Sequence, residues 1–211
     1  MDLENFFPTV TYVRVRGYFI AMGYSYPVAS SLALLMTEAV RQPVEVENER
    51  FYVPIGPRHC VQGAPTSPGI CNAIFLKADR RIAGLAKSMG FVYTRYADDL
   101  TFSGPADHKV ARSLVWRLEK LLTEEGFRVN AGKTSIRTRR GRQCVTGVVV
   151  NDVAGLSRQD RRKLRAMAHR LQANPGASPE DEARFKGKLA YLAMLNPAQA
   201  ARFTPGSPSS H

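Results

Sequence analysis

The stretch that most constrains how this chain can fold is Tyr96-Ala97-Asp98-Asp99-Leu100, which lies between two runs that resemble strands. Residues 91–95 precede it and residues 100–103 follow it, and both runs are rich in β-branched and aromatic side chains. We therefore predict a hairpin with two adjacent carboxylates at its tip. Such close like charges repel, and a divalent metal with oxygen ligands, such as Mg²⁺, would relieve the repulsion. A solvated turn is the simpler alternative, because turns favour Asp.

Charge indicates the kind of partner. The formal net charge is +12, from 30 Lys and Arg against 18 Asp and Glu. Residues 126–142 contain no acid, and residues 157–172 contain only Asp160 among many basic residues. This concentration of charge toward the C-terminal half favours a polyanionic partner, either nucleic acid or an acidic membrane face, and predicts a phosphate-binding surface.

Length and composition set the class of protein. A chain of 211 residues predicts one domain, or one domain with a small appendage. We find no apolar run near the roughly 18 residues that a membrane helix needs, and no signal pattern in the first twenty residues. The widely spaced Cys60, Cys71 and Cys144 show no metal-site spacing, so we interpret them as small buried residues of a cytoplasmic protein.

The first half of the chain predicts alternating elements. We expect a strand at the start that ends at Pro8, helices over residues 10–22 and 27–40, and extended chain from residue 44 to 55. A turn-rich loop over residues 62–69 opens a helix capped by Ser67 that runs to about Met89. Residues 107–125 form the clearest amphipathic helix. Its expected buried side comprises Val110, Leu114, Trp116, Leu118, Leu121 and Leu122.

The second half predicts short strands and then helices. Residues 127–129 and 135–137 are predicted strands around a turn at residues 130–134, and residues 143–150 are a predicted apolar strand. Ser157 and Ser178 begin two helices separated by Asn174-Pro175-Gly176, and we expect a disordered tail over residues 204–211. The predicted fold class is α+β: a catalytic body over residues 1–155 with a small antiparallel sheet packed on helices, then a basic helical appendage over residues 156–203.

Four motifs in order give the chain a family resemblance. Asp2 precedes Phe6-Phe7, a Gln-Gly-x-Pro-x-Ser-Pro loop begins at Gln62, the Ala-Asp-Asp hairpin follows, and an Asn-x-x-Lys-Thr turn ends at Thr134. Over roughly residues 2–150 this set resembles the reverse transcriptases. Val145-Thr146-Gly147 is similar to a signature of the bacterial retron-type branch. Group II intron maturases share most of the motifs and are an alternative.

The resemblance implies an RNA-directed DNA polymerase with a palm over residues 1–155 and a thumb over residues 156–203. Two Mg²⁺ ions, with Mn²⁺ as a possible substitute, would activate the primer 3′-hydroxyl and neutralise the leaving pyrophosphate. Asp2 and Asp98 would be the shared metal ligands, Asp99 the supporting one, and Leu3 belongs to the same ligand set. Lys133 would protonate the departing pyrophosphate, with a solvated turn lysine as the alternative.

The resemblance also assigns binding residues. Phe7 would be an aromatic gate that collides with a ribose 2′-hydroxyl, with Phe6 beside it on the opposite side of the strand, and Gln62 and Gly63 would contact the dNTP. The aromatic gate argues against an RNA-dependent RNA polymerase. Tyr96 and the thumb would contact a structured RNA template and primer and the RNA–DNA hybrid. The expected thumb contacts are Arg161, Arg162, Arg165 and Lys188.

The family builds its fingers largely from sequence before the first catalytic Asp, which here is residue 2. We therefore expect the isolated chain to be poorly active, with activity restored by a partner that supplies the fingers. A truncated product and a catalytically inactive RNA-binding subunit are the alternatives, and the retron branch also suggests a role in antiviral defence.

Overall fold

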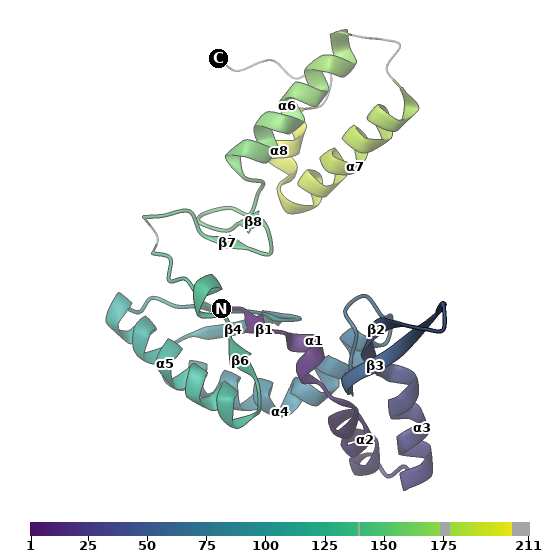
Figure 1. The fold of residues 1–211 in the computed structure, drawn as a ribbon. Helices are drawn as coiled ribbons and strands as arrows, with labels where there is room; N and C mark the ends of the chain where they lie inside the picture. The colour runs from purple at the N-terminus through teal and green to yellow at the C-terminus, as the bar shows by residue number, and fades with distance from the viewer. Residues whose placement is uncertain (139, 174–177, 204–211) are drawn as a thin grey trace. The chain divides into compact units, whose positions relative to one another are not determined.

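The computed structural model describes residues 1–138, 140–173 and 178–203, which fall into two compact units, Met1–Ile136 and Arg137–His211 (Figure 1). We call them unit 1 and unit 2. Unit 1 contains, in order, β1 (Leu3–Glu4), α1 (Phe6–Thr9), α2 (Tyr12–Ala21), α3 (Tyr26–Met36), β2 (Glu38–Val46), β3 (Glu49–His59), α4 (Ser67–Ser88), β4 (Val92–Tyr96), β5 (Asp99–Ser103), α5 (His108–Glu124), β6 (Arg128–Val129) and a 3₁₀ turn, η1 (Ala131–Lys133).

Two small antiparallel ribbons position the site. β4 and β5 form the predicted hairpin, in which Tyr96 lies opposite Asp99. β1 pairs with β6 through Leu3 and Val129, and a single antiparallel bridge between Asp2 and Asp99 joins β1 to the start of β5. The strand that carries Asp2 therefore lies between the hairpin and β6.

Helices α4 and α5 cover one face of these ribbons (Figure 1) and supply about half of the buried core residues of unit 1. Leu114, Leu118, Leu121 and Leu122 of α5 are buried, and burying each such side chain stabilises the fold by about 1.5–3 kcal/mol. Gly126, with a φ of +77°, ends the α5 segment as predicted. The predicted burial of Trp116 is wrong: the residue is 65% exposed, and Val110 also reaches solvent.

Several predicted boundaries in unit 1 need correction. The strand at the start is only two residues long, because Asn5 adopts a left-handed conformation (φ 47°, ψ 45°) and turns the chain into the helical turn α1, which contains Pro8. Helix α3 ends at Met36, where the hairpin strand β2 soon takes over, rather than at residue 40. Thr66, not Ser67, is the N-cap of α4. Residues 135–137 form no strand.

Unit 2 begins with a hairpin and ends in helices. The predicted strand over residues 143–150 is instead β7 (Cys144–Val145) and β8 (Val148–Val149), because Thr146 and Gly147 both have positive φ and reverse the chain. α6 (Arg158–Ala173), α7 (Pro179–Leu195) and α8 (Pro197–Ala201) follow. Leu164, Leu192, Ala200 and Phe203 form their core. The predicted caps are confirmed, since Ser157 Oγ accepts from Asp160 N and Ser178 Oγ from Asp181 N.

Three other predictions can be compared with the structure. The mixed α+β class with small antiparallel sheets is confirmed. Cys60 and Cys71 are buried as predicted, whereas Cys144 is exposed. In the described part of the chain, no helix combines the length and apolarity needed to cross a bilayer. The predicted linker Asn174-Pro175-Gly176 and the tail over residues 204–211 lie outside the described residues.

Candidate active site

Backbone pairing brings Asp2 next to the hairpin that carries Asp98 and Asp99. The Leu3 amide donates to the Asp98 carbonyl at 2.9 Å, and the Leu100 amide donates to the Met1 carbonyl at 2.7 Å. These bonds flank Asp2 and Asp99, so the two aspartates form a non-hydrogen-bonded antiparallel pair. In such pairs the Cα atoms are about 4.5 Å apart and the side chains lie on the same face. Asp2 and Asp99 are thus neighbours although 97 positions separate them.

The same alternation places the aspartates away from the core. Leu3 and Leu100, next to Asp2 and Asp99, are 2% and 0% exposed and face the helices. Because side chains alternate along a strand, Asp2 and Asp99 point to the opposite face. Asp98 lies at the tip of the hairpin, after Ala97, whose φ of +52° is unusual for a residue with a Cβ. Since the Leu3 side chain is buried, only its backbone carbonyl could take part in metal binding.

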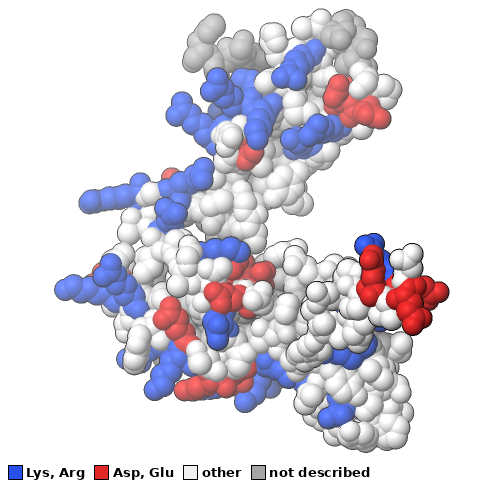
Figure 2. Space-filling model, viewed as in Figure 1, with Lys and Arg blue, Asp and Glu red and all other residues white. Residues whose placement is uncertain are grey.

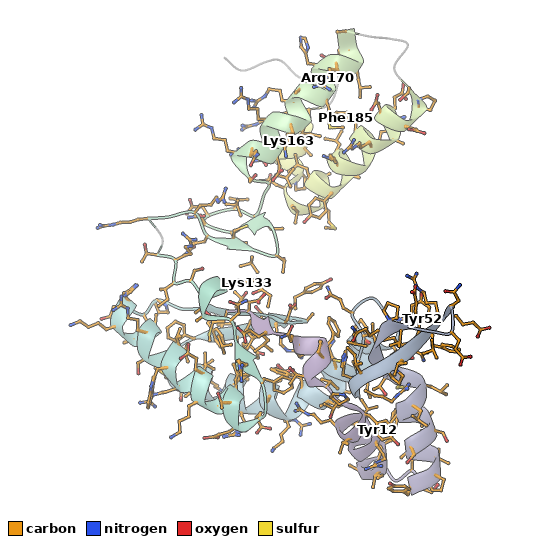
Figure 3. The ribbon with its side chains drawn as sticks, in the orientation of Figure 1. Tyr12, Tyr52, Lys133, Lys163, Arg170 and Phe185 are labelled. Carbon is orange, nitrogen blue, oxygen red and sulfur yellow. The ribbon has the colours of Figure 1, made fainter. Side chains whose placement is uncertain are left out.

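Lys133 is positioned against Asp2 by the turn that follows β6. The Asn130 amide donates to the Asp2 carbonyl at 2.8 Å, and Asn130 Oδ1 accepts from the Lys133 amide at 3.3 Å. Lys133 projects from this turn beside β1 (Figure 3), and its Nζ lies 3.2 Å from Asp2 Oδ1 and 3.4 Å from Oδ2. The predicted carboxylate and the predicted lysine therefore meet in one ion pair.

The donor set fits a hard divalent cation in its chemistry, because carboxylate oxygens are the ligands that Mg²⁺ prefers. Two of the acidic residues face each other in a narrow pair, and Lys133 already supplies one positive charge at Asp2. The side chains themselves are not gathered around one point: among the described residues, no group of three or more His, Cys, Asp or Glu is arranged to hold a metal ion. The backbone thus assembles the three acids without a preformed metal cage.

A largely buried arginine that the sequence analysis did not single out supports the hairpin. Arg95 Nε and Nη2 lie 2.9 and 2.6 Å from the two carboxylate oxygens of Asp79 on α4, and its Nη1 donates to the Ala97 carbonyl at 2.8 Å. Its guanidinium also lies 4.4 Å from the centre of the Phe75 ring. Arg95 therefore ties the strained turn that carries Asp98 to the helix layer.

Tyr93 completes this anchor. Its hydroxyl donates to Asp79 Oδ1 at 2.7 Å, and burial together with that hydrogen bond raises the pKa of Tyr93. The alternation of side chains along β4 could have identified these two residues from the sequence. Tyr93 and Arg95 lie on the inner face of the strand, whereas Val92, Thr94 and Tyr96 are exposed.

Phe6 and Phe7 were predicted to lie on opposite sides of a strand. Both lie instead on the helical turn α1, so strand alternation does not explain why their burial differs. Phe6 is 3% exposed and packs edge-on against Phe75, with ring centres 5.6 Å apart. Phe6 is therefore part of the core and its ring is not open to a nucleotide. Phe7 is half-buried at the edge of the core.

The remaining predicted binding residues are accessible. Gln62 and Gly63 lie on the loop before α4, where Gly63 has a φ of +93° that favours glycine. Tyr96 is 74% exposed and lies across from Asp99. In unit 2, Arg162 and Arg165 on α6 and Lys188 on α7 are exposed, and Arg161 is partly buried. Figure 2 shows the basic side chains gathered over α6.

Comparison with known proteins adds an independent finding. Residues 1–182 match the family model described as reverse transcriptase (RNA-dependent DNA polymerase). The chain is 56% identical over 203 residues to the retron Mx65 reverse transcriptase of Myxococcus xanthus, and 42% identical over 219 residues to the retron Mx162 enzyme of the same organism. These alignments cover 96% of this chain but 47% and 45% of the relatives. The retron Ec86 reverse transcriptase of Escherichia coli is 35% identical over 93% of this chain and 55% of its own length. The chain thus spans about half the length of the relatives that it matches.

Proposed function

The chain belongs to the retron-type reverse transcriptases, and from this premise we propose that it carries the palm and thumb of an RNA-directed DNA polymerase that adds dNTPs to a primer 3′-hydroxyl. The observation that carries the proposal is the narrow antiparallel pairing of Asp2 with Asp99, beside Asp98 and Lys133. Residues far apart in sequence converge there on the solvent side of a sheet whose other side is core.

We assign the residues as follows. Asp2 and Asp98 would be the shared ligands of two Mg²⁺ ions, with Asp99 and the Leu3 carbonyl in support. Bound Mg²⁺ would lower the pKa of the primer hydroxyl and neutralise charge on the leaving pyrophosphate. Lys133 Nζ, which forms an ion pair with Asp2 in this structure, would donate a proton to the departing pyrophosphate. Arg95 is a positioning residue, because it holds the Ala97 carbonyl and touches no reacting atom.

Substrate selection is assigned to the α1 turn and the loop before α4. Phe7 would exclude a ribose 2′-hydroxyl, while Gln62 and the backbone at Gly63 would contact the nucleotide. The exposed basic residues of α6 and α7 would bind the phosphates of a structured RNA and of the RNA–DNA hybrid.

Because the chain spans about half the length of its relatives, we propose that polymerisation needs the rest of such an enzyme, supplied by the same polypeptide or by another chain. The test is Mg²⁺-dependent dNTP incorporation on a primed RNA template by this chain mixed with a separately expressed N-terminal half of a close relative. Incorporation should depend on both components and should be abolished by Asp98→Asn. Extension that survives Asp98→Asn would refute the catalytic assignment.

A second candidate function is nucleic-acid binding without catalysis. It is favoured by the ion pair between Asp2 and Lys133, in which a lysine already neutralises one of the carboxylates assigned to metal binding. RNA binding that persists while the reconstituted mixture incorporates no dNTP, at any Mg²⁺ or Mn²⁺ concentration, would select this function.

A further inference from the structure

The solvent face of α5 carries the only Trp of the chain in an unexpected position. Trp116 is 65% exposed, although Trp is a large apolar residue that is highly buried on average. At 3.6 residues per turn it lies about 160° around the helix from the buried Leu114 and Leu118. Trp116 therefore points almost directly away from the core of unit 1.

Three cations surround the indole on that face. Lys109, Arg112 and Lys120 are exposed and lie within about 40° of Trp116 around the helix axis. Among the described residues, none of the three has a carboxylate within ion-pair distance, whereas Arg81 on α4 pairs with Glu124 near the other end of α5. Figure 2 shows basic side chains over α5, with acidic side chains among them. The face thus presents an open aromatic ring among three cations that have no ion pair in the described residues, with Glu119 as the nearest acid around the helix, about 60° from Trp116.

This combination fits an unpaired stretch of nucleic acid. Proteins bind single strands by stacking bases on exposed aromatic rings while cations contact the backbone phosphates. Arg112 and Lys120 are eight residues apart, about 12 Å along the helix, and Trp116 lies midway between them. That span covers roughly three to four nucleotides stacked at 3.4 Å. A membrane surface fits less well, because an interfacial helix exposes a broad apolar face, whereas the apolar face of α5 is buried.

This face is separate from the candidate active site. Asp2 and Asp99 point away from the helix layer, and Trp116 points outward from the other side of that layer. At least the thickness of one helix, about 10–12 Å, therefore lies between them. The two sites therefore have no side chain in common.

We propose that the α5 face, defined by Lys109, Arg112, Trp116 and Lys120, is a second nucleic-acid site. It binds an unpaired segment of RNA or DNA, with Trp116 stacked on a base and the three cations on flanking phosphates. The proposal does not depend on polymerase activity.

The single Trp makes the test direct, because Trp emission from this chain reports on residue 116 alone. We would titrate the chain with poly(U) RNA, poly(dT) and a blunt RNA duplex, in a background in which Arg161, Arg162 and Arg165 are changed to Gln to weaken binding by unit 2. At least one of the two single strands should quench the Trp116 emission and shield the indole from quenching by acrylamide, whereas the duplex should do neither. The strand that quenches identifies the RNA or DNA source.

Variants give the second readout. In the same background, Trp116→Ala should weaken single-strand binding about 5- to 150-fold, and Trp116→Phe should restore part of the affinity. Arg112→Gln with Lys120→Gln should reduce the salt slope by about 1.4, whereas the control Lys77→Gln, a cation already paired with Glu125, should change it little.

Three results would overturn the proposal. The first is single-strand binding, measured by anisotropy, without quenching and with equal affinity for Trp116→Ala. The second is the absence of single-strand binding in this background. The third is protection of the emission only by anionic vesicles or by self-association of the chain.

Discussion

Replacing Asp79 by Asn should destabilise unit 1 strongly, although Asp79 takes no part in the proposed chemistry. Its carboxylate accepts two hydrogen bonds from Arg95 and one from Tyr93. The Arg95 and Asp79 side chains are only 9% and 22% exposed, so the pair is largely withdrawn from water.

The magnitude follows from what the substitution leaves behind. Removing one partner of a buried pair costs about 3–5 kcal/mol, because the other charge remains buried without compensation. Asp79 is partly exposed, and the Asn oxygen can still accept one of the bonds. Arg95 also keeps its bond to the Ala97 carbonyl and its contact with Phe75. We therefore expect a loss of about 2–3 kcal/mol in the free energy of unfolding.

The assay is denaturant unfolding followed by far-ultraviolet circular dichroism, with Glu45→Gln as the matched control. Glu45 also pairs with an arginine, Arg50, but the two side chains are 74% and 62% exposed, and such pairs contribute about 0–1 kcal/mol. If Asp79→Asn unfolds within about 0.5 kcal/mol of Glu45→Gln, the anchor contributes no more than a surface pair, and the reasoning fails.

Three further predictions use the same structure. Phe7→Ala should lower the preference for dNTP over rNTP in primer extension by the reconstituted enzyme, while Tyr52→Ala on the β2–β3 hairpin should not; an unchanged preference removes the gate assignment. The hydrogen bond from Arg81 lowers the pKa of Glu125 from its ordinary value of 4.5, so the stability that this group adds is complete above that pH and is lost as the pH falls through the lowered value. Glu125→Gln should therefore reduce the fall in Tm on acidification from neutral pH. The control Glu119→Gln, on α5, should leave that fall as in the parent. If Glu125→Gln and the parent lose Tm identically on acidification, the pairing is contradicted. Changing both Arg162 and Arg165 to Gln should reduce the salt slope of duplex binding by about 1.8, compared with little change for Lys186→Gln, whose ammonium pairs with Glu182; an unaltered slope would exclude these arginines as phosphate contacts.

Local signals were enough to predict the elements that build the site. The β4–β5 hairpin, α4 and α5 follow from strand composition, a turn-rich loop before Pro68 and apolar periodicity, and each lies close to its predicted range. The family motifs then indicated which distant residues should meet. That Asp2 pairs with Asp99 in register, while Asp98 occupies the tip, could not be predicted, because register is set by the tertiary pairing of β1 with both β5 and β6.

The errors have physical causes of a similar kind. Trp116 was assigned to the core because of its residue type, yet its helical phase places it opposite the leucines, and phase decides burial on an amphipathic helix. The apolar run at residues 143–150 was interpreted as one strand, yet Thr146-Gly147 in positive φ makes it a hairpin. Phe6 and Phe7 were predicted to lie on a strand, yet that strand ends at Asn5, whose left-handed backbone conformation starts the helical turn α1.

The backbone of Asp2 fixes the position of the residue, whereas its carboxylate has the proposed chemical role. Its position depends on backbone bonds: the Asn130 amide donates to the Asp2 carbonyl, and the bonds of Leu3 and Leu100 flank the bridge to Asp99. Within the part of the chain that the structure describes, its side chain pairs with Lys133 alone. The Asp2 side chain is 20% exposed, but that of Lys133 is 65% exposed, so its charge stays in contact with water when the partner is removed, and such pairs contribute about 0–1 kcal/mol. Asp2→Asn should therefore leave the free energy of unfolding within about 1 kcal/mol of the parent, since Asn keeps every backbone bond.

The same change should abolish dNTP incorporation by the reconstituted enzyme, because a neutral amide lacks the negative charge with which a carboxylate would hold two Mg²⁺ ions. Asp79→Asn supplies the contrasting case, in which stability falls although no reacting group is altered. If Asp2→Asn also unfolded at much lower denaturant concentration, the Asp2 carboxylate would be part of the scaffold. Lost activity in that variant would then say nothing about metal binding.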